Sequence, residues 1–505
     1  MNSSVTLDWF LTLLPEISLV ILLAAILIYD RGLNPSNRRN IGLLTAWGAF
    51  FILLLTLGVW LFLNIPDTSA SLQESLYWGG MIRNDLITLI FRVMFLSALL
   101  LVSLITVDTK RLQRGEFFAL LVAATIGFSL MGASADLIMI YVALETASIS
   151  SYLLAGYKTE DDLSTEAGIK YFIYGAFATA VMLYGMSFIY GLFGETNIYA
   201  IGSSISTFVA QNGSIPAEAN GLLLLAALLI IVGLGFKISA VPLHFWTPDV
   251  YHGSPTSFTA FVSTASKAAG FAVFLRVFDA GVLGVPDKSS YWWAMLVAIC
   301  VVTMTLGNMA AIFQKNLKRL LAYSSIAQAG YAMIGLVVFT PDGSAATMFY
   351  LLMYVFTNMA AFGVIILISN VSNSDDLKDL YGLNRRSPYL ALAMLFALLS
   401  LGGIPPTAGF IGKFFLFKAA VEAGLWWLAL IGILNAFIAL YYYLTIVKYM
   451  YLYRSDEEAV AIPVSRAAQI GLAISTALII ILGIYAGPAF DWTREAANAF
   501  FPFIG

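Results

Sequence analysis

The most informative residues in this sequence are ionisable side chains that lie inside long apolar segments. Glu145 interrupts YVALETASISSYLLAGY, Lys237 lies in GLGFKISAVPLHFW, Lys267 in FVSTASKAAGF and Lys413 in LGGIPPTAGFIGK. A charged side chain at the centre of a bilayer costs about 2.5–3.5 kcal/mol on insertion scales, so such residues usually face a partner or a wet cavity. Burial and neighbouring charges tune their proton affinities. The pattern therefore predicts proton transfer along a line of buried titratable groups.

Glu145 and Lys237 would form the first pair on this line. Glu145 has no basic neighbour in the sequence, so its partner must come from another helix. Lys237 lies at a break in its segment, where a nearby carboxylate would restore the proton affinity that burial removes. A Glu145–Lys237 pair would then hold a tunable proton. The alternative is structural: Glu145 could serve packing alone, and Lys237 could extend its ammonium group to the membrane interface.

Lys267 and Lys413 would continue the line. Lys267 lies near the middle of its segment beside Ser263 and Ser266, whose hydroxyls can organise water. Lys413 lies at the break of a later segment and is expected to mirror Lys237. A structural role is again the alternative for both lysines.

Lys170 and His244 complete the set of candidate proton-transfer residues. Lys170 begins the sixth apolar segment, and it either reaches outward to the interface or joins Glu145. His244 follows Pro242, and an ordinary pKa of about 6.5 suits a relay, although a packing role fits as well. We expect His252 in a loop at a re-entrant turn.

The remaining charged residues in apolar segments have simpler interpretations. Lys418 and Glu422 are four residues apart and are expected to pair near a helix end. Arg92 and Arg276 are expected to be structural or interfacial. The sequence has no phosphate-binding loop, nucleophilic triad or metal-ligand spacing. Proton transfer is therefore the chemistry that remains.

Composition excludes several other classes of protein. The chain has 505 residues, of which 60% are hydrophobic and 11% charged, whereas soluble domains carry about 25% charged residues. Such a chain fits a lipid solvent, where backbone groups must be satisfied within helices. One cysteine, Cys300, and two histidines argue against disulfides, iron–sulfur ligation, haem and zinc. The sequence also has no stripe of basic residues of the kind that binds nucleic acid.

The elements that must position these residues are membrane-spanning helices. A span needs about 20 mostly apolar residues. The sequence predicts an all-α, polytopic membrane protein of about fourteen spans. These lie at residues 9–29, 41–63, 86–105, 117–131, 137–154, 167–193, 221–241, 255–282, 291–313, 320–339, 345–369, 389–421, 425–452 and 470–486.

Basic residues alternate between the predicted loops. Odd-numbered loops carry fifteen: Arg31, Arg38, Arg39, Lys110, Arg111, Arg114, Lys158, Lys315, Lys318, Arg319, Lys378, Arg385, Arg386, Arg454 and Arg466. Even-numbered loops and the tail carry three, namely Arg83, Lys288 and Arg494. The positive-inside rule then places the odd loops in the cytoplasm and both termini outside.

Two of the predicted spans, the seventh and the twelfth, are too long and are interrupted. Residues 221–251 would form a straight helix of about 46 Å, and Gly233, Gly235 and Pro242 would break it. Residues 389–421 contain a similar glycine- and proline-rich break at LGGIPPTAG. Interrupted spans at corresponding places in two halves are typical of an ion site.

The spacing also predicts internal symmetry. Five spans in residues 117–282 and five in residues 290–453 would form two repeats, and an odd number of spans makes adjacent repeats inverted. Three helices in residues 1–116 would precede them. One helix and a short tail in residues 454–505 would follow.

Three long motifs resemble one known family. Residues 246–278, 314–336 (QKNLKRLLAYSSIAQAGYAMIGL) and 403–414 (GIPPTAGFIGKF) are similar to the antiporter-like membrane subunits of respiratory complex I, and the resemblance covers roughly residues 117–452. The family pattern has a glutamate in the fifth span and lysines in the seventh, eighth and twelfth, which Glu145, Lys237, Lys267 and Lys413 match. The twelfth-span lysine and the short tail at residues 491–505 resemble subunit N most. His252 departs from the acid that many relatives have.

The resemblance implies a proton-translocating subunit of NADH:quinone oxidoreductase, with no redox centre in this chain. Lys170 and His244 would join the polar axis. No cofactor would be bound here: NADH, FMN, iron–sulfur clusters and quinone would belong to other subunits. The implied partners are adjacent antiporter-like and small membrane-arm subunits in a bacterial inner (plasma) membrane. The periplasmic side would hold both termini.

Three alternatives stay open at this point. The chain could be a subunit of an Mrp-type sodium/proton antiporter, or the equivalent subunit of a ferredoxin-dependent complex. It could also be a scaffold whose polar groups only hold helices together.

Overall fold

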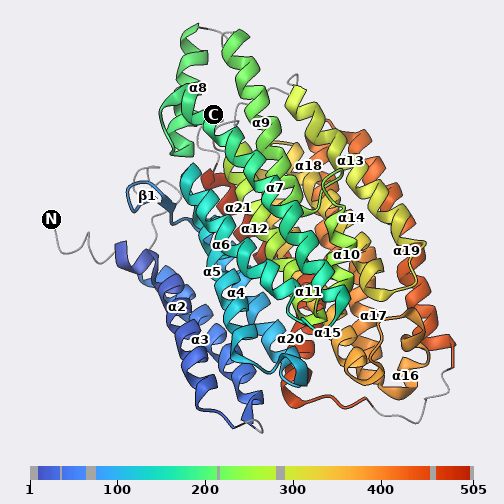
Figure 1. Cartoon of the computed structure of the whole chain (residues 1–505). Coiled ribbons are helices and arrows are strands. Elements are labelled where there is room, and N and C mark those ends of the chain that lie inside the picture. The colour runs from blue at the N-terminus through green and yellow to red at the C-terminus, as the bar shows by residue number, and fades with distance from the viewer. Residues whose placement is uncertain are drawn as a thin grey trace.

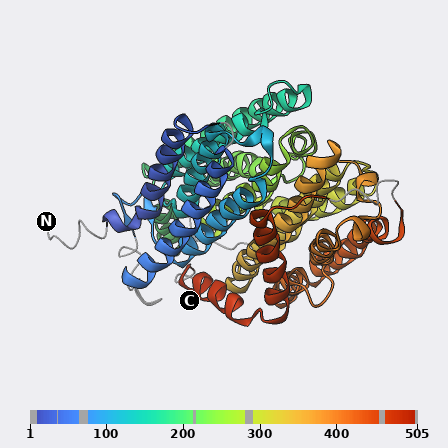
Figure 2. The same ribbon diagram turned by 90° about the horizontal axis from the view of Figure 1, so that it is seen from below.

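The computed structural model describes residues 9–34, 37–63, 76–212, 217–279, 291–454 and 462–500. These residues form a bundle of long helices with one small β-hairpin (Figure 1). The predicted all-α membrane architecture is therefore confirmed. In the view from below, the N-terminal helices lie at one end of the bundle and the helices near residue 400 at the other (Figure 2).

The first half of the chain contains the hairpin and eleven of the labelled helices. Its elements are α2 (Leu14–Arg31), α3 (Arg39–Leu63), β1 (Leu76–Tyr77), β2 (Ile82–Arg83), α4 (Leu86–Thr106), α5 (Gly115–Ala133), α6 (Leu137–Ala155), α7 (Asp162–Phe193), α8 (Ile198–Asn212), α9 (Ala217–Ile238), α10 (Trp246–Gly253), α11 (Thr256–Phe261) and α12 (Lys267–Phe274). The strands β1 and β2 pair antiparallel.

The second half is helical throughout its described part. Its elements are α13 (Tyr291–Ala311), α14 (Leu317–Val337), α15 (Pro341–Ser372), α16 (Leu383–Arg386), α17 (Pro388–Gly402), α18 (Ala408–Glu422), α19 (Trp426–Leu452), α20 (Arg466–Ile484) and α21 (Gly487–Phe500). Short 3-10 helices at Lys110–Leu112 and Leu377–Leu380 lie in two connections.

Within the described residues, twelve helices are long and apolar enough to cross a membrane. The other two predicted spans coincide with α2, which carries charged residues near both ends, and with the pair α17 and α18. The total of fourteen spans stays a prediction. So do the two inverted repeats and their boundaries, and residues 283–289 at the predicted junction lie outside the described residues, as does Lys288.

The seventh and twelfth spans are broken, as the sequence predicts. The helix α9 ends at Ile238, and α10 begins at Trp246. The helix α17 ends at Gly402, and α18 begins at Ala408. Each break leaves backbone carbonyl groups at a helix end without partners in their own helix, at a depth where lipid offers none.

The eighth predicted span is irregular in a way that the sequence does not reveal. Two π-helical turns, Val262–Ser266 and Leu275–Asp279, lie on either side of α12, so that Lys267 directly follows a π-helical turn. Single π-turns inside helices are frequent at functional sites. Residues 257–278 of this segment are all buried in the bundle.

Two helices and one histidine differ from the sequence-based expectations. The helix α8 lies in a connection with no predicted element, and α21 lies in what was expected to be a short tail. The aromatic ring of Phe490 in α21 stacks on Phe415 in α18 at 3.7 Å between centroids. His252 lies in the last turn of α10, so the prediction of a loop position is wrong.

The buried centre of the bundle is formed by α14 and α15. Every described residue of α15 from Gly343 to Ile368 is buried, and α14 is buried along almost its whole length. Around them pack α10 and α11 from the first half and α17, α18 and α20 from the second. Polar side chains on α14 and α15 therefore face protein rather than lipid.

Candidate functional site

Three lysines lie deep inside the bundle. Lys237 is 1% exposed, Lys267 is 2% exposed and Lys413 is 4% exposed. Each ammonium group donates a hydrogen bond to an oxygen of a neighbouring helix or half-helix. None of the three reaches the membrane interface, so the alternative of outward-extended lysines does not describe them.

Lys237 contacts the helix that carries Glu145. Its Nζ donates to Ser148 Oγ at 3.0 Å and lies over the ring of Phe128. Ser148 follows Glu145 by three residues and shares its helix face. No ion pair joins Glu145 and Lys237 in the described part of the chain, so the predicted direct pair is corrected to a near neighbourhood through Ser148. One oxygen of Glu145, Oε1, is buried without a protein partner.

Lys267 is held by α14. Its Nζ donates to the backbone oxygen of Ser325 at 2.6 Å. The hydroxyl of Tyr354 donates to Ser325 Oγ at 2.9 Å, and the amide of Asn358 donates to Tyr354 and to Ser263. This hydroxyl–amide cluster joins Ser263, in the π-helical turn before Lys267, to Ser325, the residue that Lys267 binds.

Lys413 spans the break between α17 and α18 by binding the carbonyl groups at the end of α17. Its Nζ donates to the carbonyl oxygens of Leu401 at 2.8 Å and Gly402 at 3.2 Å, which end α17, and it lies over the ring of Tyr331. A cation is favourable at a helix C-terminus, where unpaired carbonyls carry partial negative charge. Lys413 lies in the second half-helix, whereas Lys237 lies in the first, so the expected mirror relation is inexact.

Gln328 of α14 links the environments of Lys267 and Lys413. Its amide nitrogen donates to the same Leu401 oxygen at 3.1 Å, and its amide oxygen accepts from the hydroxyl of Tyr350. Because Gln328 lies three residues after Ser325, both face the same side of α14. The polar groups that hold Lys267 and those that hold Lys413 therefore lie one turn apart on the same face of α14.

Between Lys237 and Lys267, the helices α9 and α12 pack directly against each other. Gly270 lies one turn after Lys267 in α12, and a Cβ atom at this glycine would be 3.4 Å from Lys237 Cγ. Among the described residues, several buried oxygens on this side of the bundle have no protein partner, including those of Ser239 and Thr247. Buried polar groups are normally satisfied by protein or by ordered water. The first half of the axis therefore offers sites for bridging water.

Lys170 joins a different cluster from the one predicted. Its ammonium group contacts Glu166 and Asp249, each at 2.6 Å, and its side chain is partly exposed. Arg319 of α14 binds the other oxygen of Asp249 at 2.8 Å. Of the two alternatives, the ammonium group therefore extends outward, to a partly exposed cluster, and does not join Glu145. It helps to hold the short half-helix α10 between α7 and α14.

His244 lies in the break between α9 and α10. Its side chain is buried and its ring packs against Phe245 at 4.6 Å between centroids. This position follows Lys237 by seven residues and is compatible with either a relay or a packing role.

The other charged residues behave as expected. Arg92 binds Glu16 at 2.9 Å, and Arg276 binds Asp85 at 2.7 Å, both inside the protein and away from the three lysines. Lys418 pairs with Glu422 at 3.6 Å on the exposed face of α18.

Sequence reasoning missed the neutral residues that connect the lysines. A detectable signal exists in α14, where Ser324, Gln328 and Tyr331 recur at helical spacing, and in α15, where Tyr354 and Asn358 are four apart. These polar stripes on otherwise apolar helices mark a face that is turned toward other polar groups.

The arrangement can move protons, and it offers little else chemically. Within the described residues, no group of three or more histidine, cysteine or acidic side chains could hold a metal ion. Amines, a carboxylate, hydroxyls and amides can pass protons directly or through water when their proton affinities are similar.

Comparison with known proteins places the chain among membrane subunits of ion-translocating complexes. Residues 134–439 match the family described as NADH:quinone oxidoreductase/Mrp antiporter, transmembrane. The sequence is 44% identical to NADH-quinone oxidoreductase subunit N of Moorella thermoacetica over 81% of this chain and 84% of that one. It is 39% identical to subunit N of an Anaeromyxobacter species over 96% of both chains.

Solved structures share the same fold. A chain of respiratory complex I from Thermus thermophilus superimposes with a TM-score of 0.77 at 32% identity, covering 94% of this chain and 98% of that one. A chain of an Mrp complex from a Dietzia species gives a TM-score of 0.79 at 21% identity, covering 99% and 98%.

Proposed function

Because this chain belongs to the NADH:quinone oxidoreductase/Mrp antiporter transmembrane family, we propose that it is the proton-translocating subunit N of an NADH:quinone oxidoreductase. Protons move along an axis formed by Glu145, Lys237, Lys267 and Lys413. Quinone reduction in other subunits supplies the energy, because moving one charge against 100 mV costs about 2.3 kcal/mol and this axis contains no energy source of its own.

One observation carries this proposal: the three buried lysines each bind a polar group of a neighbouring element, and Leu401 O connects the last of them to α14. A scaffold needs polar groups to tie helices together. It does not need amines at three successive places in a bundle, where each costs several kcal/mol of desolvation.

The sequence identities favour the quinone oxidoreductase over an Mrp antiporter. Relatives named subunit N share 39–44% of residues with this chain, whereas the Mrp chain shares 21%. We propose that other membrane-arm subunits flank the chain, that NADH, FMN, iron–sulfur clusters and quinone bind elsewhere in the complex, and that the basic loops face the cytoplasm of a bacterium. This orientation leaves both termini on the periplasmic side.

The test is proton pumping by the assembled complex in proteoliposomes. Glu145→Ala and Lys237→Ala should assemble, retain NADH-dependent quinone reduction in uncoupled vesicles and lose at least half of the protons moved per NADH. Lys413→Ala should do the same, because its loss leaves the carbonyls of Leu401 and Gly402 without a cationic donor.

Lys418→Ala is the matched control. Lys418 lies five residues after Lys413 on the same half-helix, but its side chain is 51% exposed. The complex with Lys418→Ala should pump protons normally. If Glu145→Ala and Lys237→Ala assemble and also pump normally, the polar axis is a scaffold.

A further inference from the structure

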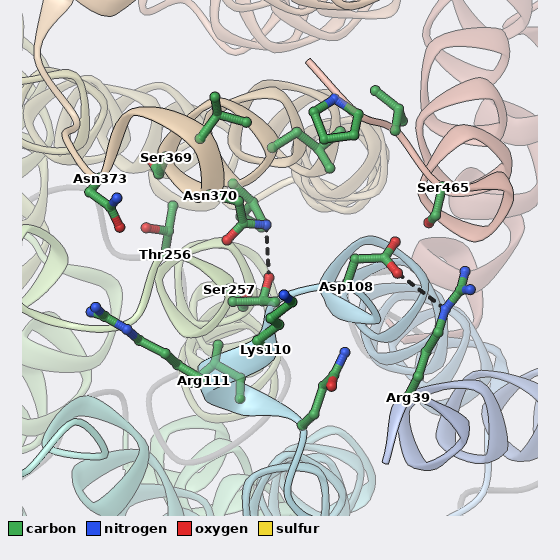
Figure 3. A pocket seen from close by; sticks show the side chains of 18 of the residues that line it. Arg39, Asp108, Lys110, Arg111, Thr256, Ser257, Ser369, Asn370, Asn373 and Ser465 are labelled. Atoms are coloured by element: carbon green, nitrogen blue, oxygen red, sulfur yellow. Dashed lines mark hydrogen bonds and ion pairs between the residues drawn. The ribbon is translucent and has the colours of Figure 1, made fainter. Parts of the chain in front are cut away.

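A large cavity lies at the end of the bundle where the predicted cytoplasmic loops gather, apart from the lysine axis. It has a volume of about 1130 Å³ and opens between the start of α3, the connection from α4 to α5, α11, α15 and the segment before α20 (Figure 3). Its walls therefore come from both the N-terminal and the C-terminal parts of the chain. None of the proposed proton-transfer residues lines it.

The cavity is strongly cationic. Among the described residues that line it, one is a carboxylate, Asp108, and six are basic: Arg38, Arg39, Lys110, Arg111, Arg114 and Lys158. Arg39 pairs with Asp108 at 3.1 Å. The other five form no ion pair within the described residues.

The neighbouring like charges repel one another, and a bound anion would stabilise them. The Nε of Arg38 is buried without a hydrogen-bond acceptor, although guanidinium groups prefer bidentate oxygen partners. Burial and the neighbouring cation Lys318 lower the pKa of the Lys158 ammonium below its usual value. A bound anion would relieve both costs.

The remaining lining indicates which anion fits. Thr256, Ser257 and Asn370 offer hydroxyl and amide donors beside the cations (Figure 3), and the Ser257 hydroxyl is buried without a partner. Ile366 and Leu367, one turn before Asn370 on α15, add apolar surface to the lining. Phosphate oxygens bind arginine, lysine and hydroxyl donors, and an apolar wall suits an attached hydrocarbon chain.

We propose that this cavity binds the phosphate head group of an anionic phospholipid. Basic pockets between helices on the cytoplasmic side are suited to such head groups, and each lysine or arginine near the membrane surface adds about 1 kcal/mol of attraction. Proton uptake is a poor alternative, because a surface lined by six cations repels positive charge. A bound head group would join the N-terminal helices to α15 and to the segment before α20.

The experiment measures phosphatidylglycerol bound to the purified whole complex. The complex is washed in zwitterionic detergent, placed in phosphatidylcholine nanodiscs and titrated with labelled phosphatidylglycerol, and the lipid retained is counted by mass spectrometry. The double variant Lys110→Gln/Arg111→Gln should retain one molecule fewer per complex and bind that site at least tenfold more weakly. Lys315→Gln is the control, since Lys315 is an exposed cation on the same side that does not line the cavity.

Three outcomes overturn the proposal. The first is equal lipid retention by the double variant and the parent complex. The second is loss of the lipid in the charge-conserving variant Lys110→Arg/Arg111→Lys, which would mean that loop structure matters rather than charge. The third is displacement by millimolar inorganic phosphate, which would assign the cavity to a free anion. Arg111→Gln alone replaces the double variant if that variant does not assemble.

Discussion

Gln328 makes use of both ends of its side-chain amide. The nitrogen donates to Leu401 O and to the hydroxyl of Tyr443, and the oxygen accepts from Tyr350. Every partner is buried. A neutral residue in the middle of α14 thus organises the polar contacts between two lysines that lie on different helices.

We predict that Gln328→Leu uncouples the complex without preventing its assembly. Leucine fills similar space but removes the acceptor of the buried Tyr350 hydroxyl, which costs about 1–3 kcal/mol. The Tyr443 hydroxyl keeps its bond to Ser324. Protons moved per NADH should fall several-fold, as measured by quenching of a pH-sensitive dye in proteoliposomes. Gln314→Leu is the comparison, because Gln314 lies in the connection after α13 and its amide donates to the nearby Ala310 oxygen at the end of that helix. Equal losses in both variants would contradict the prediction.

At the scale of single residues, the sequence reveals the charged residues inside apolar segments but not the neutral residues that they contact. Lys237, Lys267 and Lys413 are recognisable because a cation in an apolar segment is costly and rare. Ser325 and Gln328 are not, because serine and glutamine are compatible with many helix positions and carry no charge. The direct Glu145–Lys237 pair was expected from sequence alone, but side-chain positions on separate helices depend on packing that no local pattern contains.

The broken twelfth span depends on close approach of the α17 and α18 backbones. Gly409 lies in the first turn of α18, and its N–H donates to Ser400 Oγ of α17 at 3.0 Å. A Cβ atom at this position would overlap the carbonyl oxygen of Ser400. The absence of a side chain is therefore what lets the two half-helices meet and brings Lys413 onto the end of α17.

Gly409→Ala should separate α17 from α18 and draw Lys413 away from Leu401 O. We expect less assembled complex on native gels and, in the fraction that assembles, reduced proton pumping with quinone reduction retained. Gly221→Ala is the control, because Gly221 lies in the other broken span and a Cβ there would meet no atom within 4 Å. Normal assembly and pumping by Gly409→Ala would show that the half-helices tolerate separation.

Element boundaries were predictable where glycine and proline determine them. The breaks in the seventh and twelfth spans follow from such residues. The π-helical turns around Lys267 were not predictable, because residues 255–282 read as one uninterrupted apolar span. The helices α8 and α21 were missed for the opposite reason: each is too short or too polar to stand out as a span.

The whole molecule is held together partly by buried ion pairs far from the lysines. Arg276, which is 0% exposed, binds Asp85 at the start of α4 through two nitrogens, and it also donates to Tyr199 of α8. These contacts tie the N-terminal helices and α8 to the π-helical end of the eighth span. Asp85 is outside the membrane segments, and although its burial opposes ionisation, Arg276 and Arg83 hold its pKa at about 2.

Asp85→Asn should lower the thermal stability of the complex markedly, because it leaves the guanidinium of Arg276 buried without a counter-charge. Loss of one partner of a buried pair costs about 3–5 kcal/mol. The double variant Asp85→Asn/Arg276→Met should recover part of the loss, since the buried charge of Arg276 is then gone, and only the ion pair of Arg83 with Asp85 is still missing. The thermal stability of both variants is measured as the temperature at which quinone reduction is lost. If the double variant is less stable than Asp85→Asn, the charge is not the cause.

Sequence patterns do not predict how distant segments of the chain pack into one bundle. Hydropathy and basic loops predict membrane helices and their orientation, because those properties are local. They do not predict that α21 returns to stack Phe490 on Phe415, or that residues from both ends of the chain line the cationic cavity.

The oxygen of Leu401 is shared by a lysine and an amide, so the strength of each hydrogen bond depends on the other donor. Lys413 and Gln328 draw on the same two lone pairs. When Lys413 gives up its proton, the neutral amine attracts that oxygen less, and the amide of Gln328 becomes the stronger donor. If Lys413 titrates as proposed, its protonation state would in this way reach α14, which also anchors Lys267.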